Sequence, residues 1–296
     1  MRGAGHLGAV RMIATRVGGQ LSFDHSHIVN DTGHALLAEG LRVDADLVIN
    51  DALVLGGDDR CAVSLHSAYI GGQLLGDDMA VANTSDAALT ADLLRVDGDV
   101  LLRRTVIVGR GHSGTLALPA AHIRGHLMLG ASRITNPSGP ALYATRLHVG
   151  GDLSFRMADV RGTSETGAVN LAAAEAGQLD CDELTVRNPS GPLLDLENVR
   201  VRDVMVFPAA VACTTDHTQN LVMDGLVVNE LRDIDWRAWL HLITHHTERY
   251  RPQPYQQLAA LERAAGHDGN ARRCSSHSSK TSAAALPTCW ADGGCA

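Results

Sequence analysis

The segment 109–114 has the glycine spacing of a dinucleotide-binding loop, G-x-G-x-x-G, and it follows the apolar run 105–108. In nicotinamide-binding folds this loop opens a helix, and an acidic residue about 20 positions further on binds the ribose. Here the chain continues with Leu-Ala-Leu-Pro over 116–119, an alternation typical of a strand, and no Asp or Glu occurs between Asp99 and Asp152. We therefore predict a turn at this segment, and no cofactor.

Three histidines, His241, His245 and His246, lie in a segment with helical periodicity. His241 and His245 have the i, i+4 spacing of zinc ligands, but the glutamate of the H-E-x-x-H motif is missing from the string His-Leu-Ile-Thr-His. A solvated helix face is the simpler interpretation, and we predict no metal site.

Asp46, Asp99 and Asp152 recur every 53 residues. Such a row could form the acidic stripe of a carbohydrate-cleaving β-helix enzyme. The chain has few aromatic side chains, 3% of its residues, on which sugars could stack. Because the three aspartates belong to the repeat itself, we predict that they cap turns.

The charges are unevenly distributed along the chain. Residues 24–99 contain 14 Asp or Glu, whereas residues 100–151 contain none. A cluster of one charge attracts the opposite charge, so this stretch predicts a basic belt that receives an acidic partner or an anionic surface. The alternative is a solvated arginine face. The belt arginines are Arg103, Arg104, Arg110, Arg124, Arg133 and Arg146.

An internal repeat must position all of these residues. A set of β-branched residues recurs at alternating intervals of 26 and 27, namely Val17, Val43, Ile70, Val96, Ile123 and Val149. Around them apolar residues alternate with polar ones, as in strands, and strings such as Asn136-Pro137-Ser138-Gly139 mark turns. The repeat predicts an all-β parallel β-helix of about nine coils of about 26 residues, a narrow triangular rod on the order of 40 Å long.

The rod is expected to span residues 1–231 and to end in a helical cap over residues 232–273. Trp236, Trp239, Leu240 and Ile243 share one helical face, and a second helix is predicted over 255–265. An open solenoid end exposes strand edges, so a lid containing two tryptophans suits this position.

The bulk properties restrict the partners and the location. The formal net charge is −8, and residues 1–231 carry 17 Arg against 27 Asp or Glu, a balance that argues against general nucleic-acid binding. We find no signal peptide and no apolar run of the roughly 20 residues that a membrane span needs. Scattered cysteines favour a reduced, cytoplasmic protein; peripheral association with a membrane stays open.

Three strings, 15–21, 68–74 and 147–153, read TRVGGQL, AYIGGQL and LHVGGDL. They resemble a group of actinobacterial β-solenoid repeat proteins that are often described as oxidoreductases or membrane-associated oxidoreductases. The string 251–260 resembles the ending of that group, and the resemblance covers roughly residues 5–273. It implies the solenoid fold and a redox activity, and it carries no catalytic residue over to this chain.

After the pair Arg272-Arg273 the family ending typically continues with Val-Leu-Ile-Ala-Gln, whereas here Cys-Ser-Ser-His-Ser follows. Residues 274–296 are rich in Ser, Ala and Cys and lack periodicity. We predict a disordered tail over 274–296, produced by a frameshift.

These observations favour a non-catalytic solenoid that acts as a scaffold or protein-interaction module, with a protein partner or further copies of itself. An oxidoreductase, which the resemblance implies, is the first alternative. A second is an acidic solenoid that mimics nucleic acid, because the body balance is −10 (17 basic minus 27 acidic residues).

Overall fold

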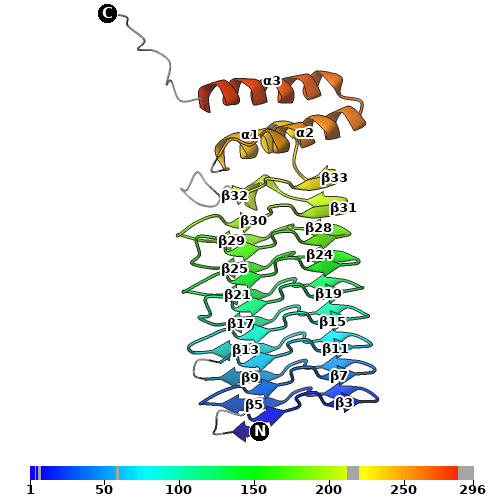
Figure 1. Ribbon diagram of the computed structural model, residues 1–296, viewed down its shortest axis with the longest axis vertical. Helices are drawn as coiled ribbons and strands as arrows, with labels where there is room; N and C mark the ends of the chain where they lie inside the picture. The colour runs from blue at the N-terminus through cyan, green and yellow to red at the C-terminus, as the bar shows by residue number, and fades with distance from the viewer. Residues whose placement is uncertain (4, 6–7, 58–59, 212–219, 248, 286–296) are drawn as a thin grey trace, which may run out of the picture.

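The computed structural model describes residues 1–296 except 4, 6–7, 58–59, 212–219, 248 and 286–296, and of residues 279–285 it describes only the backbone. The chain winds into a rod of stacked parallel coils with three helices at its C-terminal end (Figure 1). The predicted all-β parallel solenoid with a helical cap is confirmed.

Among the described residues, most coils contribute four short strands, each paired in parallel with the strands of the coils before and after it. Each coil therefore crosses four columns of strands, and these columns form three sheets because the third sheet contains two of them.

The first sheet consists of β1 (Arg2–Gly3), β5 (His27–Asn30), β9 (Leu53–Gly56), β13 (Ala80–Asn83), β17 (Val106–Val108), β21 (Arg133–Thr135), β25 (Asp159–Arg161) and β29 (Thr185–Arg187). The second sheet consists of β2 (Val10–Arg11), β6 (Leu36–Leu37), β10 (Val63–Ser64), β14 (Leu89–Thr90), β18 (Leu116–Ala117), β22 (Leu142–Tyr143), β26 (Val169–Asn170), β30 (Leu194–Asp195) and β32 (Leu221–Val222).

The third sheet has two columns. The first column contains β3 (Arg16–Val17), β7 (Arg42–Val43), β11 (Tyr69–Ile70), β15 (Arg95–Val96), β19 (His122–Ile123), β23 (His148–Val149) and β27 (Glu175–Ala176). The second contains β4 (Leu21–Ser22), β8 (Leu47–Val48), β12 (Leu74–Leu75), β16 (Val100–Leu101), β20 (Leu127–Met128), β24 (Asp152–Ser154) and β28 (Gln178–Asp180). The long strand β31 (Arg200–Val206) joins the columns and pairs with β33 (Val227–Arg232).

Each coil passes through the second sheet, the two columns of the third sheet and the first sheet in that order. The first column of the third sheet therefore lies across the rod from the first sheet, as Figure 1 shows for β7 and β9. Residues in the left-handed conformation form corners between strands, for example Leu93 with φ of 58° and Arg104 with φ of 56°. Non-glycine residues adopt this conformation rarely, so its recurrence marks a required bend.

The apolar residues that reveal the repeat are stacked as expected. Val43 pairs with Ile70, Ile70 with Val96, and these three side chains are at most 1% exposed. The aliphatic columns form one continuous core that also includes Phe155 and Phe207. A narrow tube filled by stacked aliphatic side chains explains the low aromatic content.

The sequence predicts turns at strings that begin with asparagine, such as the string 136–139. Asn136 accepts a hydrogen bond from Ser138 N (2.9 Å), the predicted turn contact. Its amide Nδ2 also donates to Pro140 O (2.8 Å) and to Gly111 O (2.8 Å) in the preceding coil. Asn30 and Asn188 make equivalent pairs of bonds. Each of these asparagines therefore joins two coils as well as closing its own turn.

The segment 109–114 is a turn between β17 and β18 and leads directly into that strand. Gly114 has φ of +108°, and Gly167, one double repeat later, has φ of +106°. The turn predicted here is confirmed.

The cap comprises α1 (Trp236–His245), α2 (Pro252–Ala264) and α3 (Asp268–Ala285), and a short 3-10 helix, η1 (Ala209–Val211), precedes it. Asp235 caps α1 by accepting from Arg237 N and Ala238 N. The predicted shared face is buried at Trp239, Leu240 and Ile243, and the cap core is continuous with the coil core.

The predicted boundary at residue 273 falls inside α3, and Cys274 is fully buried in the cap core. Residues 274–285 are therefore helical where we expected a disordered tail, and the remainder of that predicted tail, 286–296, lies outside the described residues. The frameshift that we predicted for 274–296 stays a prediction.

Candidate functional site

The six belt arginines encircle the rod instead of gathering on one side. Arg110 follows β17, Arg124 follows β19, Arg133 begins β21, and Arg146 is the left-handed corner residue before β23. Arg103 and Arg104 occupy the corner between β16 and β17. The belt is therefore divided around the rod: Arg124 and Arg146 border the first column of the third sheet, whereas the other four arginines border the first sheet.

Most belt arginines pair with acids of a neighbouring coil. Arg104 lies 2.6 Å from Asp78 and Arg133 lies 3.8 Å from Asp159. Arg103 bonds Asp77, and Arg124 lies 3.5 Å from Asp97. The acid-free stretch 100–151 thus meets acids from the coils on either side of it, and much of its predicted positive charge is neutralised.

A second row of basic side chains runs along the rod instead of around it. On the outer side of the third sheet's first column, successive coils present residues that the strand pairing places directly above one another. We call this the ladder face, and its members are Arg16, Arg42, Tyr69, Arg95, His122 and His148. Sequence reasoning missed the ladder face although each member directly precedes one of the repeat's marker residues, Val17 to Val149.

Contacts between neighbouring coils order the ladder face. The Arg42 guanidinium lies 4.6 Å from the centre of the Tyr69 ring, a cation–π contact. The Tyr69 hydroxyl donates to Asp97 (2.7 Å), which is also the partner of Arg124. Arg95, between these groups, forms no ion pair or side-chain hydrogen bond among the described residues. Its guanidinium is therefore available to an external acceptor.

The groove beside these residues has a volume of about 900 Å³ and extends over four coils. The corner residues Ser67, Leu93 and Ala120 line it together with Ala68. Its charged and aromatic lining is Arg42, Tyr69, Arg95, Asp97, His122 and Arg124. Leu93 is 52% exposed, so the groove offers apolar contact beside its cations.

His122 and His148 stack with ring centroids 4.5 Å apart and an interplanar angle of 4°. Burial lowers the pKa of His122, and the nearby His148, Arg95 and Arg124 lower it further, whereas Asp97 opposes them. Protonation of His122 therefore adds a cation to a surface that already carries several.

We expect His122 to titrate below its ordinary pKa of 6.5, and His148→Gln to raise that pKa because a cationic neighbour is removed. As the pH falls, the imidazole of the unfolded chain is protonated before that of the folded chain. The contribution of neutral His122 to the stability of the fold is therefore present above pH 6.5 and is lost as the pH falls through the folded-state pKa. NMR titration of the imidazole resonances measures both values. An unchanged His122 pKa in His148→Gln would contradict the stacking argument.

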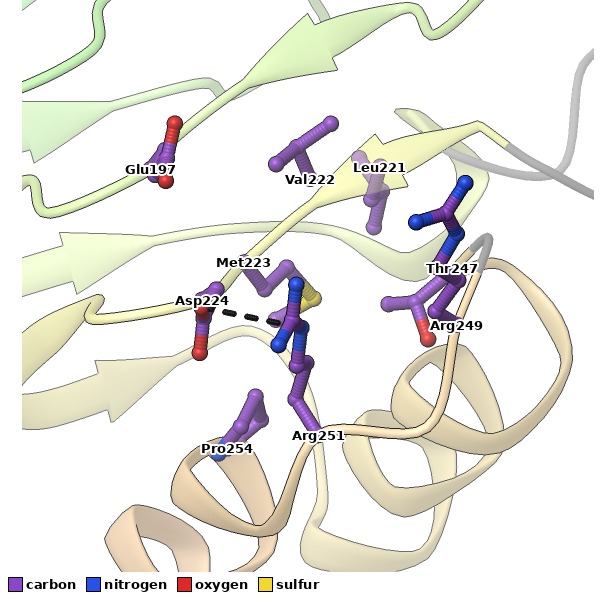
Figure 2. A pocket seen from close by; sticks show the side chains of 9 residues that line it. All are labelled: Glu197, Leu221, Val222, Met223, Asp224, Thr247, Arg249, Arg251 and Pro254. Carbon is purple, nitrogen blue, oxygen red and sulfur yellow. Dashed lines mark ion pairs between the residues drawn. The ribbon is translucent and has the colours of Figure 1, made fainter. Parts of the chain in front are cut away.

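A smaller pocket, of about 250 Å³, lies where the last coil meets the cap (Figure 2). Arg249 and Arg251 approach it from the segment before α2, and Glu197 and Asp224 approach it from the coils. Arg251 lies 3.8 Å from Asp224. Two acids and two arginines line the pocket, so it does not favour ions of one sign. The Arg251–Asp224 pair connects the cap to the last coil.

The histidines of α1 do not form the arrangement that zinc requires. The rings of His241 and His245 lie 4.6 Å apart, and His246 Nδ1 lies 3.2 Å from Asn220 Nδ2 of the last coils. Within the described part of the chain, no three His, Cys, Asp or Glu residues are grouped so that they could hold a metal ion.

The recurrent aspartates act as caps between coils. Asp46 accepts from Gln73 N (2.8 Å) and Asp99 from His126 N (2.9 Å). His126 Nδ1 takes the same role one coil later by accepting from Asp152 N (2.9 Å). The predicted capping role is confirmed for Asp46 and Asp99.

One cysteine–histidine pair was not singled out from the sequence. Cys61 Sγ lies 3.5 Å from His34 Nδ1, which itself lies 2.7 Å from Cys61 O. Nδ1 therefore carries a proton and cannot accept the thiol proton. Burial raises the pKa of Cys61 to about 11, and a thiol that stays protonated is a poor nucleophile.

Comparison of the chain with protein-family models, with curated proteins and with solved structures finds no match. No helix of the described chain has the length and apolar character needed to span a membrane.

Proposed function

We propose that this protein is a non-catalytic binding module whose ladder face holds an extended acidic segment of a partner protein. One observation supports the proposal above all others. Arg42, in the coil before Tyr69, and Arg95, in the coil after it, flank this tyrosine along a groove that extends over four coils. Successive coils are about 4.8 Å apart.

The chemistry of the ladder face suits carboxylates. A guanidinium donates several N–H groups in a planar fork that matches a carboxylate. Arg95 lies between Tyr69 and His122 in the column of strands, and its guanidinium needs no internal bond to be broken before it binds. Four coils span about 15–20 Å, which matches an extended peptide of about five or six residues.

The surroundings of the groove favour a short acidic peptide over larger anions. Asp44 and Asp97 lie beside the arginines, and the body as a whole is acidic, so a long nucleic acid would meet repulsion outside the groove. Neither nucleic-acid mimicry nor a redox activity is proposed, because no contact among the described residues supports either.

We expect Arg95→Glu to weaken binding of a fluorescein-labelled peptide of about eight glutamates at least tenfold, which corresponds to about 1.4 kcal/mol. Fluorescence anisotropy measures the affinity, which should fall with added salt because exposed charges are screened. The matched control is Arg187→Glu on the first sheet, across the rod, with an effect below about twofold.

Equal affinity of the wild type and Arg95→Glu would contradict the proposal. Anionic phospholipid vesicles and a single-stranded oligonucleotide serve as competing probes in the same assay. Stronger Arg95-dependent binding to either of them would replace the acidic peptide by that class of partner.

A further inference from the structure

The outer side of the first sheet changes character along the rod. In β9, β13 and β17 the outward-facing residues are apolar, and in β21, β25 and β29 the same positions are mostly charged. Val106 and Val108 are 41% and 37% exposed. With Val29 of β5 they form an apolar patch, whose members are Val29, Leu53, Leu55, Ala80, Ala82, Val106 and Val108.

The strands of the patch pair without a register shift, so its outward residues form regular rows along the rod. A contiguous exposed apolar surface on a sheet typically marks an interaction site. A groove of about 460 Å³ follows the patch along the ends of its strands. Asp31 lies at one end of this groove and Arg110 at the other, three coils apart.

We propose that the apolar patch binds the same patch of a second copy of this chain, with the two rods antiparallel. A two-fold axis parallel to the strands reverses the order of the coils and keeps the strand direction. It places β9 against β13 and β5 against β17 of the other copy. This arrangement goes beyond the proposed ladder-face function and uses the opposite side of the rod.

The sizes of the side chains fit this arrangement. In the centre, Leu53 meets Ala80 and Leu55 meets Ala82 of the other copy, so large side chains face small ones, as in well-packed sheets. At the two ends, Val29 meets Val108 and the exposed His27 meets Val106. In the alternative with parallel rods the two-fold axis follows the rod, and Leu53 would face Leu55.

The charges fit it as well. The antiparallel arrangement brings Asp31 of one copy to Arg110 of the other, twice by symmetry. With parallel rods, Arg110 would face Arg104, a like charge. Asp31 also pairs with Arg2 of its own chain (3.1 Å), so Arg110 of the other copy would join an existing ion pair. At the opposite edge the acids Asp51 and Asp78 approach each other, but both already pair within the chain, with His25 and Arg104.

The patch measures about 20 Å by 13 Å. This is well below the roughly 800 Å² per partner of a standard interface, so the dimer is expected to be weak, with a dissociation constant on the order of tens of micromolar.

Sedimentation equilibrium of the full chain, up to about 300 µM, tests the proposal. We expect a reversible dimer, and we expect Val106→Lys to weaken it at least tenfold. The matched control is Thr185→Lys, at the same position of β29 outside the patch, with no effect. A monomer throughout, or equal dimerisation of wild type and Val106→Lys, would overturn the proposal.

A charge exchange tests the antiparallel arrangement without depending on the stability of a core variant. Asp31→Arg and Arg110→Asp should each weaken the homodimer about tenfold, since each creates two like-charge contacts. Mixed together, the two variants should form a heterodimer of wild-type strength, because every contact then joins opposite charges. Failure of the mixture to associate would contradict the antiparallel arrangement.

Discussion

Replacing Asn136 by Ala is expected to lower the free energy of unfolding by about 3 kcal/mol, because it removes three hydrogen bonds worth about 1 kcal/mol each. The Asn136 side chain is 1% exposed and bonds Gly111 O, Pro140 O and Ser138 N. Water cannot replace these partners in the folded state. The effect extends beyond the turn, since Gly111 belongs to the preceding coil.

Urea unfolding followed by far-UV circular dichroism measures this loss. Asn50→Ala is the matched control, because Asn50 is partly exposed and accepts one bond, from Asp77 N (2.9 Å). We expect a loss of about 1 kcal/mol for the control. Equal losses in the two variants would contradict the expectation that three bonds at a buried asparagine contribute more than one bond at a partly exposed asparagine.

Trp239→Ala is expected to lower the free energy of unfolding by about 3–5 kcal/mol, the usual cost of deleting a buried aromatic side chain. Trp239 is 2% exposed, and its ring meets Phe207 of the last coils edge-on, with centroids 5.4 Å apart. Its removal separates the cap from the coil core and exposes the end of the rod to water.

Trp236→Ala provides the matched control on the same helix. Trp236 is only half-buried and lies under Arg237, 5.0 Å from its guanidinium. Urea unfolding should show a loss less than half as large, and trypsin should cleave the cap of Trp239→Ala faster than that of Trp236→Ala. A larger loss for Trp236→Ala would contradict the expectation that the contact of Trp239 with Phe207 stabilises the cap.

The fold could be predicted because residues of the same kind recur at the core positions of successive coils. Val17, Val43 and Ile70 share both position and chemistry, so their interval of 26 or 27 residues is visible in the sequence. Stacking of like on like in a narrow core requires that similarity. The cap helix with Trp239 could be predicted because the side chains that it buries are apolar and recur with helical periodicity.

The candidate site was harder to predict because its members share a position and differ in chemistry. Only an alignment of the coils shows that Arg42, Tyr69 and His122 occupy equivalent positions. The belt arginines were instead chosen because they are close together in the sequence. The pairing acids of the belt come from other coils, which a count within residues 100–151 cannot reveal. The helix α3 was missed because its polar sequence lacks periodicity, while packing against α2 buries Ala271 and Cys274.

The two proposed surfaces lie on opposite sides of the rod. An antiparallel pair joined through the first sheets would present two ladder faces outward, in opposite directions along their rods. Such a pair could bind two acidic segments at once, and effective concentration would then raise the affinity for a partner that carries both.

The most direct test of the central proposal is to locate a bound acidic peptide on the protein. A glutamate peptide that carries one photo-crosslinking residue is irradiated in complex with the full chain, and the modified residues are identified by mass spectrometry. We predict crosslinks along the groove, at Ser67, Leu93 and Ala120 and the ladder residues beside them. Crosslinks confined to the first sheet or to the cap would contradict the assignment of the ladder face as the binding surface.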